Sequence, residues 1–294
     1  FNYTNGVVTS INGGLSPATG SSTDTINFQG WNDALVVSLD PNYAVGSVDL
    51  TISNISEITA DDLNVNTLVG SNNETVWTID GRNAGNLNDV LEFSGFNNLQ
   101  GRDRDDTFAF TSAGIIEGRI NGGGQDAGDE VDQSAVSTVY IVIGDATNGY
   151  DDIERYVADG SNATLVAPNL TNTWLVNGEL DDEGIAWSSV TNNQGEIEFT
   201  GFDTLVGGSL RDTMTVSYFE NLDVINTMAG DDRIILNIDS SENYTLAVIG
   251  EMGVDDRITI NGGAADARLN GSYSVNSVGD EVLTFERQIT DAST

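Results

Sequence analysis

Short apolar runs recur along the whole chain and alternate with stretches rich in Gly, Asn and Asp. Runs of β-branched and aromatic residues bounded by such turn formers are typical of β-strands. No stretch keeps the period of about 3.6 residues that an amphipathic helix requires. The pattern therefore predicts an all-β chain, with strands at residues 34–39, 48–52, 76–79, 107–110, 139–143, 233–236 and 257–260.

Two blocks of sequence recur at a regular spacing, which is typical of a repeat architecture. In the first block Trp77 and Trp174 hold equivalent places 97 residues apart, and a Gly-Phe-x-x-Leu-x-Gly segment follows each of them. The second copy carries an insertion of about nine residues, near residues 187–195. The other block, an Ile-Asn pair before an Asp-led strand, begins at residues 11, 120 and 225. These spacings predict repeats of about 105 residues at 1–114, 115–219 and 220–294, the last one partial or divergent.

Repeats of this length without linkers between them favour one architecture over another. The favoured fold is a right-handed parallel β-helix, or β-solenoid, in which each repeat adds several rungs to one continuous elongated core. The alternative is a string of tandem antiparallel β-sandwiches, each closed around its own core. In either fold Trp77 and Trp174 are expected in the core, because a shared place in the repeat favours packing over ligand binding.

The charge of the chain excludes several classes of function. It has 46 acidic and 10 basic residues, all of the latter Arg, for a net charge of −36, and it has no Lys, His or Cys. Such a surface repels nucleic acid and anionic membranes. A Ser-His-Asp triad, a Cys-His zinc site and a Schiff-base lysine are all excluded by composition. No apolar run reaches the 18 or so residues of a membrane span. We therefore expect no enzyme, no nucleic-acid partner and no membrane insertion.

Adjacent pairs of Asp recur along the chain, as at Asp105-Asp106 and Asp231-Asp232. Neighbouring residues of a strand point to opposite faces, so such a pair does not form the carboxylate dyad of a glycosidase. We interpret these pairs as part of a solvated acidic surface.

Gly-rich turns followed by Asp are the most distinctive motifs, and the segment from Gly207 to Asp212 resembles a calcium-binding nonapeptide. Calcium takes six to eight oxygens, which carboxylates and turn carbonyls supply. The alternative is a plain Gly-Asp turn, in which Asp caps backbone amides at the start of a strand. If calcium binds, the candidate ligands are Asp126, Asp129 and Asp132 with the carbonyls of residues 122–124, then Asp231, Asp232 and Asp212.

The order of these motifs resembles a known class of protein. The succession I-N-G-G, D-x-[IV], T-L-V-G, [TV]-W-x-[IV]-x-G and G-F-x-x-L-x-G, over residues 1–235, is similar to long repeats of giant bacterial surface adhesins. Those are related to filamentous haemagglutinin-type and calcium-repeat exoproteins. The resemblance implies a β-solenoid stalk displayed at the bacterial surface, with a role in adhesion or matrix assembly and no catalytic residues.

The expected function is that of a structural or adhesive segment of a secreted bacterial cell-surface or extracellular-matrix protein. The alternative is a calcium-dependent module that binds glycans or cells. A lyase or hydrolase is disfavoured because the chain has no Lys or His to face an acidic polysaccharide. The chain begins without Met or a basic leader, which we interpret as processing from a longer protein.

Both ends of the chain carry alternating apolar residues suited to strand addition, Phe1-Asn2-Tyr3-Thr4 at the start and Leu283-Thr284-Phe285 near the close. The open ends of a solenoid present unpaired backbone groups. The expected partners are therefore neighbouring repeats of the same protein or further copies of the chain, joined head to tail into filaments.

Overall fold

The computed structural model is all-β, as the sequence predicts, and contains no helix among the residues it describes. These are residues 10–12, 24–31, 33–39, 48–49, 51–53, 55–62, 65–144, 149–218, 220–238, 245–252, 257–262, 271–274 and 280–286. The described part thus offers no helical segment that could cross a membrane. The chain divides into two compact units, unit 1 (Phe1–Val136 and Gly144–Arg155) and unit 2 (Ser137–Ile143 and Tyr156–Thr294).

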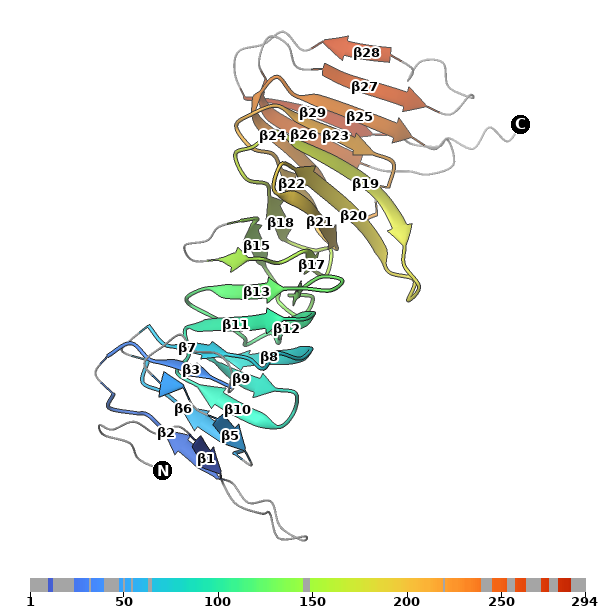
Figure 1. Ribbon diagram of the computed structural model, residues 1–294. Helices are drawn as coiled ribbons and strands as arrows, with labels where there is room; N and C mark the ends of the chain where they lie inside the picture. Colours follow the sequence, from blue (N-terminus) through green and yellow to red (C-terminus); the bar gives the residue numbers. More distant parts are fainter. Residues whose placement is uncertain are drawn as a thin grey trace. The chain divides into compact units, whose positions relative to one another are not determined.

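Unit 1 is made of short strands that lie side by side in Figure 1. They are β1 (Ser10–Asn12), β2 (Thr25–Asn27), β3 (Val36–Ser38), β4 (Val48–Asp49), β5 (Thr51–Ser53), β6 (Glu57–Thr59), β7 (Thr67–Val69), β8 (Thr75–Gly81), β9 (Ala84–Leu87), β10 (Leu91–Ser94), β11 (Asn98–Asp103), β12 (Asp106–Phe110), β13 (Ile120–Gly124), β14 (Glu130–Asp132) and β16 (Tyr150–Asp151).

Unit 2 contains longer strands. They are β15 (Val139–Val142), β18 (Ala163–Val166), β19 (Asn172–Leu180), β20 (Ala186–Asn192), β21 (Gly195–Thr200), β22 (Thr204–Val206), β23 (Asp212–Val216), β24 (Val224–Gly230), β25 (Arg233–Ile238), β26 (Thr245–Met252), β27 (Arg257–Gly262), β28 (Gly271–Ser274) and β29 (Asp280–Glu286). Strand β17 (Arg155–Val157) includes the last residue of unit 1 and the next two of unit 2.

Most strand pairs in both units are parallel, and successive strands alternate between two sheets. In unit 1, β8, β12 and β14 pair in one sheet, whereas β7, β11 and β13 pair in the other. In unit 2, β19, β23, β25 and β27 pair in one sheet, and β18, β22, β24 and β26 in the other. This pairing does not fit the alternative of antiparallel sandwiches.

Apolar side chains form columns across the paired strands, and these columns are the core. In unit 2, Trp174, Met214, Ile234 and Ile258 are neighbours in register and are at most 2% exposed. The opposite sheet has a column of Ile141, Leu165, Leu205, Ile225 and Val248, all fully or nearly fully buried. Burial of apolar surface in each column contributes a free energy of about 25 cal/mol per Å², and this contribution stabilises the parallel register.

The Trp-containing block folds as an antiparallel meander in each unit. Strands β8, β9 and β10 form it in unit 1, and β19, β20 and β21 form it in unit 2. The strands of the second meander are longer than those of the first, and residues 187–195, where the insertion was predicted, lie in β20 and the turn to β21. Both Trp side chains are fully buried, as predicted.

Aromatic neighbours surround each Trp. Trp77 stacks on Phe108 at a ring-centroid distance of 5.6 Å and meets Phe93 edge to face at 5.9 Å. Trp174 meets Phe199 in the same edge-to-face arrangement at 5.7 Å. Trp77 and Trp174 therefore hold equivalent packing positions in the two units.

The last two strands of unit 2 reverse the direction of their sheets. Strand β28 pairs antiparallel with β27, and β29 pairs antiparallel with β26 through residues that include Leu283 and Phe285. The predicted strand-forming segment at the close of the chain is thus paired within the chain on one side. The opening Phe1-Asn2-Tyr3-Thr4 lies outside the described residues.

The predicted strands all coincide with observed strands. The division into repeats at 1–114, 115–219 and 220–294 stays a prediction.

Candidate functional site

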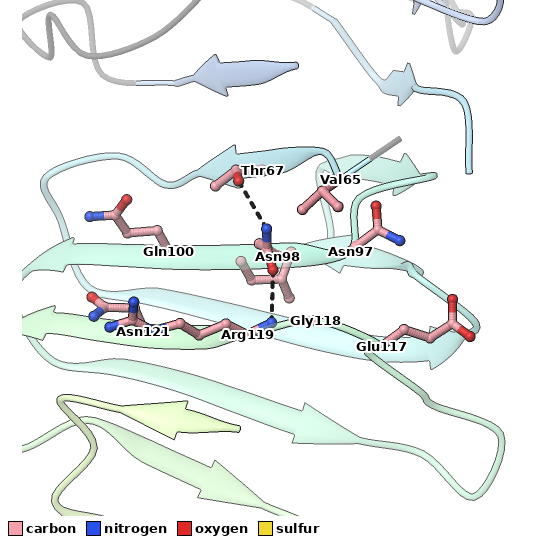
Figure 2. Close-up of a pocket in the computed structure, with 10 residues that line it drawn as sticks. Val65, Thr67, Asn97, Asn98, Gln100, Glu117, Gly118, Arg119 and Asn121 are labelled. Carbon is pink, nitrogen blue, oxygen red and sulfur yellow. Dashed lines mark hydrogen bonds between the residues drawn. The ribbon is translucent and has the colours of Figure 1, made fainter. Parts of the chain in front are cut away.

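A groove with a volume of about 580 Å³ lies on unit 1 over β7, β11 and β13 (Figure 2). Most of its lining residues are polar, and several carry side-chain amides. The lining residues are Val65, Thr67, Asn97, Asn98, Leu99, Gln100, Glu117, Gly118, Arg119 and Asn121.

Strand alternation explains why these side chains face outward. Leu99 and Ile120 point into the core and are 1% exposed. Their strand neighbours Asn98, Gln100 and Asn121 therefore lie on the opposite face, where each is partly exposed. Because the strands are parallel and in register, equivalent side chains form rows across the groove.

Hydrogen bonds connect the first row. The Asn98 side-chain amide donates to the Thr67 hydroxyl at 3.3 Å, and its Oδ1 accepts the backbone N–H of Arg119 at 2.8 Å. The Arg119 guanidinium forms an ion pair with Asp151. Asn98 therefore ties three neighbouring strands together at the floor of the groove.

Charges at the groove are paired. Asn121 Nδ2 donates to Asp151 at 3.0 Å and to Asp152 at 2.9 Å. At the other end, Glu117 Oε2 accepts from Arg82 at 2.8 Å and from Asn83 at 3.0 Å. The pKa of Glu117 is lowered, first by these two hydrogen bonds. The groove thus carries no unbalanced cationic patch that would attract a polyanion.

The equivalent surface of unit 2 is different. Strands β22 and β24 pair in the same register as β11 and β13, yet Thr204, Val206 and Val224 occupy the places of Asn98, Gln100 and Arg119. Both sets of residues are compatible with the fold. The amide-rich groove is therefore not a requirement of the strand stacking.

A second feature is a column of buried carboxyl groups on the other sheet of unit 1. Asp106 and Asp129 are 1% and 0% exposed and are neighbours in register. The Asp106 backbone N–H donates to Asp129 Oδ1 at 2.7 Å, and the Asp129 N–H donates to Glu154 at 3.0 Å. Asp129 and Glu154 thus each accept a backbone N–H from an earlier part of the chain.

Unit 2 has the same column. Asp212 is fully buried, and its backbone N–H donates to Asp232 Oδ1 at 2.8 Å. Asp212 Oδ1 accepts from the backbone N–H of Asn172 at 3.1 Å and from its side-chain amide at 2.7 Å, while Oδ2 accepts from the Gly208 N–H at 2.7 Å. The Asp212 carboxylate therefore accepts three hydrogen bonds, although burial still raises its pKa.

The two columns differ in one partner. Thr75 of unit 1 occupies the place of Asn172, and its hydroxyl donates to the Asn73 carbonyl instead. In the described part of the chain, both carboxylate oxygens of Asp106 and Oδ2 of Asp129 are buried without a hydrogen bond of normal geometry. The difference lies at one position: Asp106 has no hydrogen bond of normal geometry to its carboxylate, whereas Asp212 accepts three.

The pKa values follow from these surroundings. Burial raises the pKa of Asp106 to about 7, although Thr75 offsets part of the rise. Burial likewise raises the pKa of Asp129 to about 7, with the charges of Asp106 and Glu154 adding to the effect. In Asp105 the backbone N–H groups of residues 126–128 outweigh burial and lower the pKa.

The Gly residues of the motifs make room for the buried carboxylates. A Cβ atom on Gly101 would lie 2.2 Å from Asp106 Oδ2, and one on Gly207 would lie 2.3 Å from Asp212 Oδ2. Both distances are too short for non-bonded atoms, so a side chain at either position would clash with the carboxylate. The Gly-to-Asp spacing that resembles a calcium motif thus has a packing function in this fold, because only Gly leaves space for the carboxylate beside it.

The structure places the predicted calcium ligands in different surroundings. Asp129, Asp212 and Asp232 are buried in the two columns. Asp126 is exposed and forms an ion pair with Arg104, and Asp231 is exposed beside Arg211 at 3.4 Å.

The remaining candidate, Asp132, is partly exposed and accepts the backbone N–H of Ser134 at 2.8 Å. Among the described residues, no group of three or more acidic side chains is arranged to hold a metal ion. Calcium binding stays a prediction.

Two expectations need correction or addition. The Asp pairs were expected on the solvated surface, but in Asp105-Asp106 and Asp231-Asp232 the second residue is buried and only the first is at least partly exposed. Sequence reasoning also missed the groove. The available signal was the loss of amides between the repeats, since Asn98 and Gln100 correspond to Thr204 and Val206.

Comparisons of the chain with family models, with curated proteins and with solved structures gave no significant match.

Proposed function

We propose that this chain is a structural and adhesive segment of a secreted bacterial cell-surface or extracellular-matrix protein. In this proposal its strands are the rungs of a right-handed parallel β-helix built from repeats of about 105 residues. The observation that carries the proposal is the strand order: successive strands alternate between two sheets, and each pairs in parallel with the strand that follows one turn later. A coiled chain has this connectivity, and coiled repeats commonly form stalks.

The composition supports a structural role. The described surface is acidic and well solvated, while the interior consists of apolar columns with the two Asp columns beside them. The chain has no Lys, His or Cys, so the usual nucleophiles and bases are confined to hydroxyls and carboxylates. We propose no catalytic residue.

Association with neighbouring repeats or with further copies is part of the proposal. In the described part of unit 2, β28 and β29 are the last strands of their sheets, and each has one unpaired edge. Backbone groups at such an edge can pair with a strand of another chain. The net charge of −36 opposes close approach at low ionic strength.

The test is light scattering with negative-stain microscopy of the purified chain from about 10 mM to about 1 M NaCl, over which the Debye length falls from about 30 Å to about 3 Å. We expect rod-shaped particles that join end to end as salt increases. Calcium at matched ionic strength separates screening from specific bridging. Compact monomers at every salt concentration would contradict both the stalk and the assembly.

The second candidate function is a module that binds glycans or cells, with calcium as a proposed cofactor. The groove on unit 1 is the observation that favours it, because a pocket of this volume lies in the range of small-molecule sites.

A further inference from the structure

The groove on unit 1 offers both donors and acceptors to a ligand. Asn97 uses its Oδ1 to accept the Asn66 backbone N–H at 3.1 Å, and the described contacts leave its Nδ2 to donate. Asn121 uses its Nδ2 to bond two carboxylates, which leaves Oδ1 to accept. Glu117 is engaged through Oε2, and its Oε1 remains an acceptor. Hydroxyl groups, which donate and accept at once, match such a mixture.

The electrostatics select a neutral ligand. Arg119 is paired with Asp151, and Glu117 is paired with Arg82, so neither charge is left to bind an oppositely charged group strongly. The whole chain carries −36, which repels uronates, phosphates and sulfates. Among the described lining residues, Val65 and Leu99 have apolar side chains; Val65 is exposed and Leu99 is buried, so polar side chains supply most of the specific contacts.

The side chains of the groove are held in place before any ligand arrives. Asn98 is fixed by bonds to two neighbouring strands, and Asn121 by bonds to two carboxylates. Pre-ordered side chains reduce the entropy cost of binding. Figure 2 shows the amides of Gln100 and Asn121 in one row and that of Asn98 in the next, along the direction of strand stacking.

The comparison with unit 2 shows that the fold does not require this surface. Replacement of the amides by Thr204 and Val206 leaves the same strand register in β22. From this contrast and the donor-acceptor pattern, we infer that the groove over β7, β11 and β13 binds a neutral, hydroxyl-rich oligosaccharide. This inference names the ligand class for the proposed adhesive function, and it rests on that function.

The test uses the full chain and defined probes: neutral trisaccharides of gluco, manno and galacto configuration, with trigalacturonate as the anionic counterpart. Saturation-transfer NMR and calorimetry measure binding. We expect at least one neutral trisaccharide to bind with a dissociation constant of about 1 mM or below, and trigalacturonate to bind at least tenfold more weakly. No binding of any neutral trisaccharide at 10 mM, or tighter binding of trigalacturonate, would overturn the inference.

The decisive variant carries N98T and Q100V together, which installs the residues of unit 2 at the same register positions. Because unit 2 folds with those residues, the variant is expected to fold; a melting curve checks this, since the variant loses the hydrogen bonds of Asn98 to Thr67 and to the Arg119 N–H. We expect its trisaccharide affinity to fall at least tenfold, and unchanged affinity would overturn the inference. Assembly is measured separately by scattering, so failure of the stalk proposal and failure of the groove proposal are distinguishable.

Discussion

The buried carboxyl groups of unit 1 predict that this protein is more stable at acidic than at alkaline pH. Asp106 and Asp129 have pKa values of about 7 in the folded chain, against about 4 for an unfolded Asp. A raised folded pKa gives a contribution to the free energy of unfolding that is complete below about pH 4 and is lost as the pH rises through about 7. The sign is therefore opposite to that of an ion-paired carboxylate.

The size of the effect follows from the pKa difference. For one carboxyl group with a pKa of about 7 when folded and about 4 when unfolded, the contribution to the free energy of unfolding falls by about 2–3 kcal/mol between pH 5 and pH 8. The two groups are neighbours, and Asp105 and Glu154 face them with further negative charge, so their contributions are not added. We expect the free energy of unfolding to fall by about 2 kcal/mol or more over this range.

Urea melts at pH 5, 6, 7 and 8 measure this dependence, but general repulsion at −36 acts in the same direction. The variant Asp106→Asn removes the buried charge and keeps the volume. We expect it to be more stable than the parent at pH 8 by about 2 kcal/mol and to show a flatter pH dependence. The exposed Asp80→Asn is the matched control for the loss of one charge. Equal effects of the two variants at pH 8 would refute the reasoning.

Unit 2 suggests a second variant. Asn172 donates to Asp212 at 2.7 Å, and Thr75 stands in its place beside Asp106. Thr75→Asn should supply the missing donor, lower the pKa of Asp106 and reduce the pH dependence. Hydrogen–deuterium exchange of the peptides spanning residues 101–136 assigns the change to unit 1.

Three further predictions concern packing and metal. Trp77→Ala should cost about 3–5 kcal/mol in urea melts, whereas the exposed Val90→Ala should change stability by less than about 0.5 kcal/mol; equal effects would contradict the core assignment. Gly207→Ala should cost about 1–3 kcal/mol because its Cβ would clash with Asp212, and Gly124→Ala, whose Cβ would make only ordinary van der Waals contact with Asp103, is the control. If calcium binds, excess EDTA should lower the melting temperature relative to millimolar calcium, and identical melts would rule that binding out.

The sequence predicted the parts of the structure that depend on local pattern. Alternating apolar runs located the strands, and the equal spacing of Trp77 and Trp174 located two buried rings. Both signals come from large apolar side chains, for which the core is the favourable environment. The same reasoning indicated an all-β fold.

The candidate sites were harder to predict for physical reasons. An Asp is usually solvated, so the burial of Asp106 and Asp212 depends on a neighbouring strand that offers an N–H and on a Gly that leaves space. Both partners are distant in sequence. The groove depends on which strands become neighbours, because Thr67, Asn98 and Arg119 are brought together only by the parallel register. Motif spacing alone contains neither kind of information.

The two Asp columns have a consequence for how the chain finds its correct alignment. Stacked strands with similar apolar columns can slip by two residues and still turn the same faces inward, so hydrophobic pattern alone tolerates this error. A slipped strand would move Asp212 away from Gly207 and from the N–H groups of Asn172 and Gly208, leaving a buried charge without donors. In unit 2 that penalty of several kcal/mol falls on misaligned states, because the aligned state supplies the donors. The Asp column of unit 2 thus favours the correct strand register over slipped registers, in a chain whose repeats otherwise resemble one another.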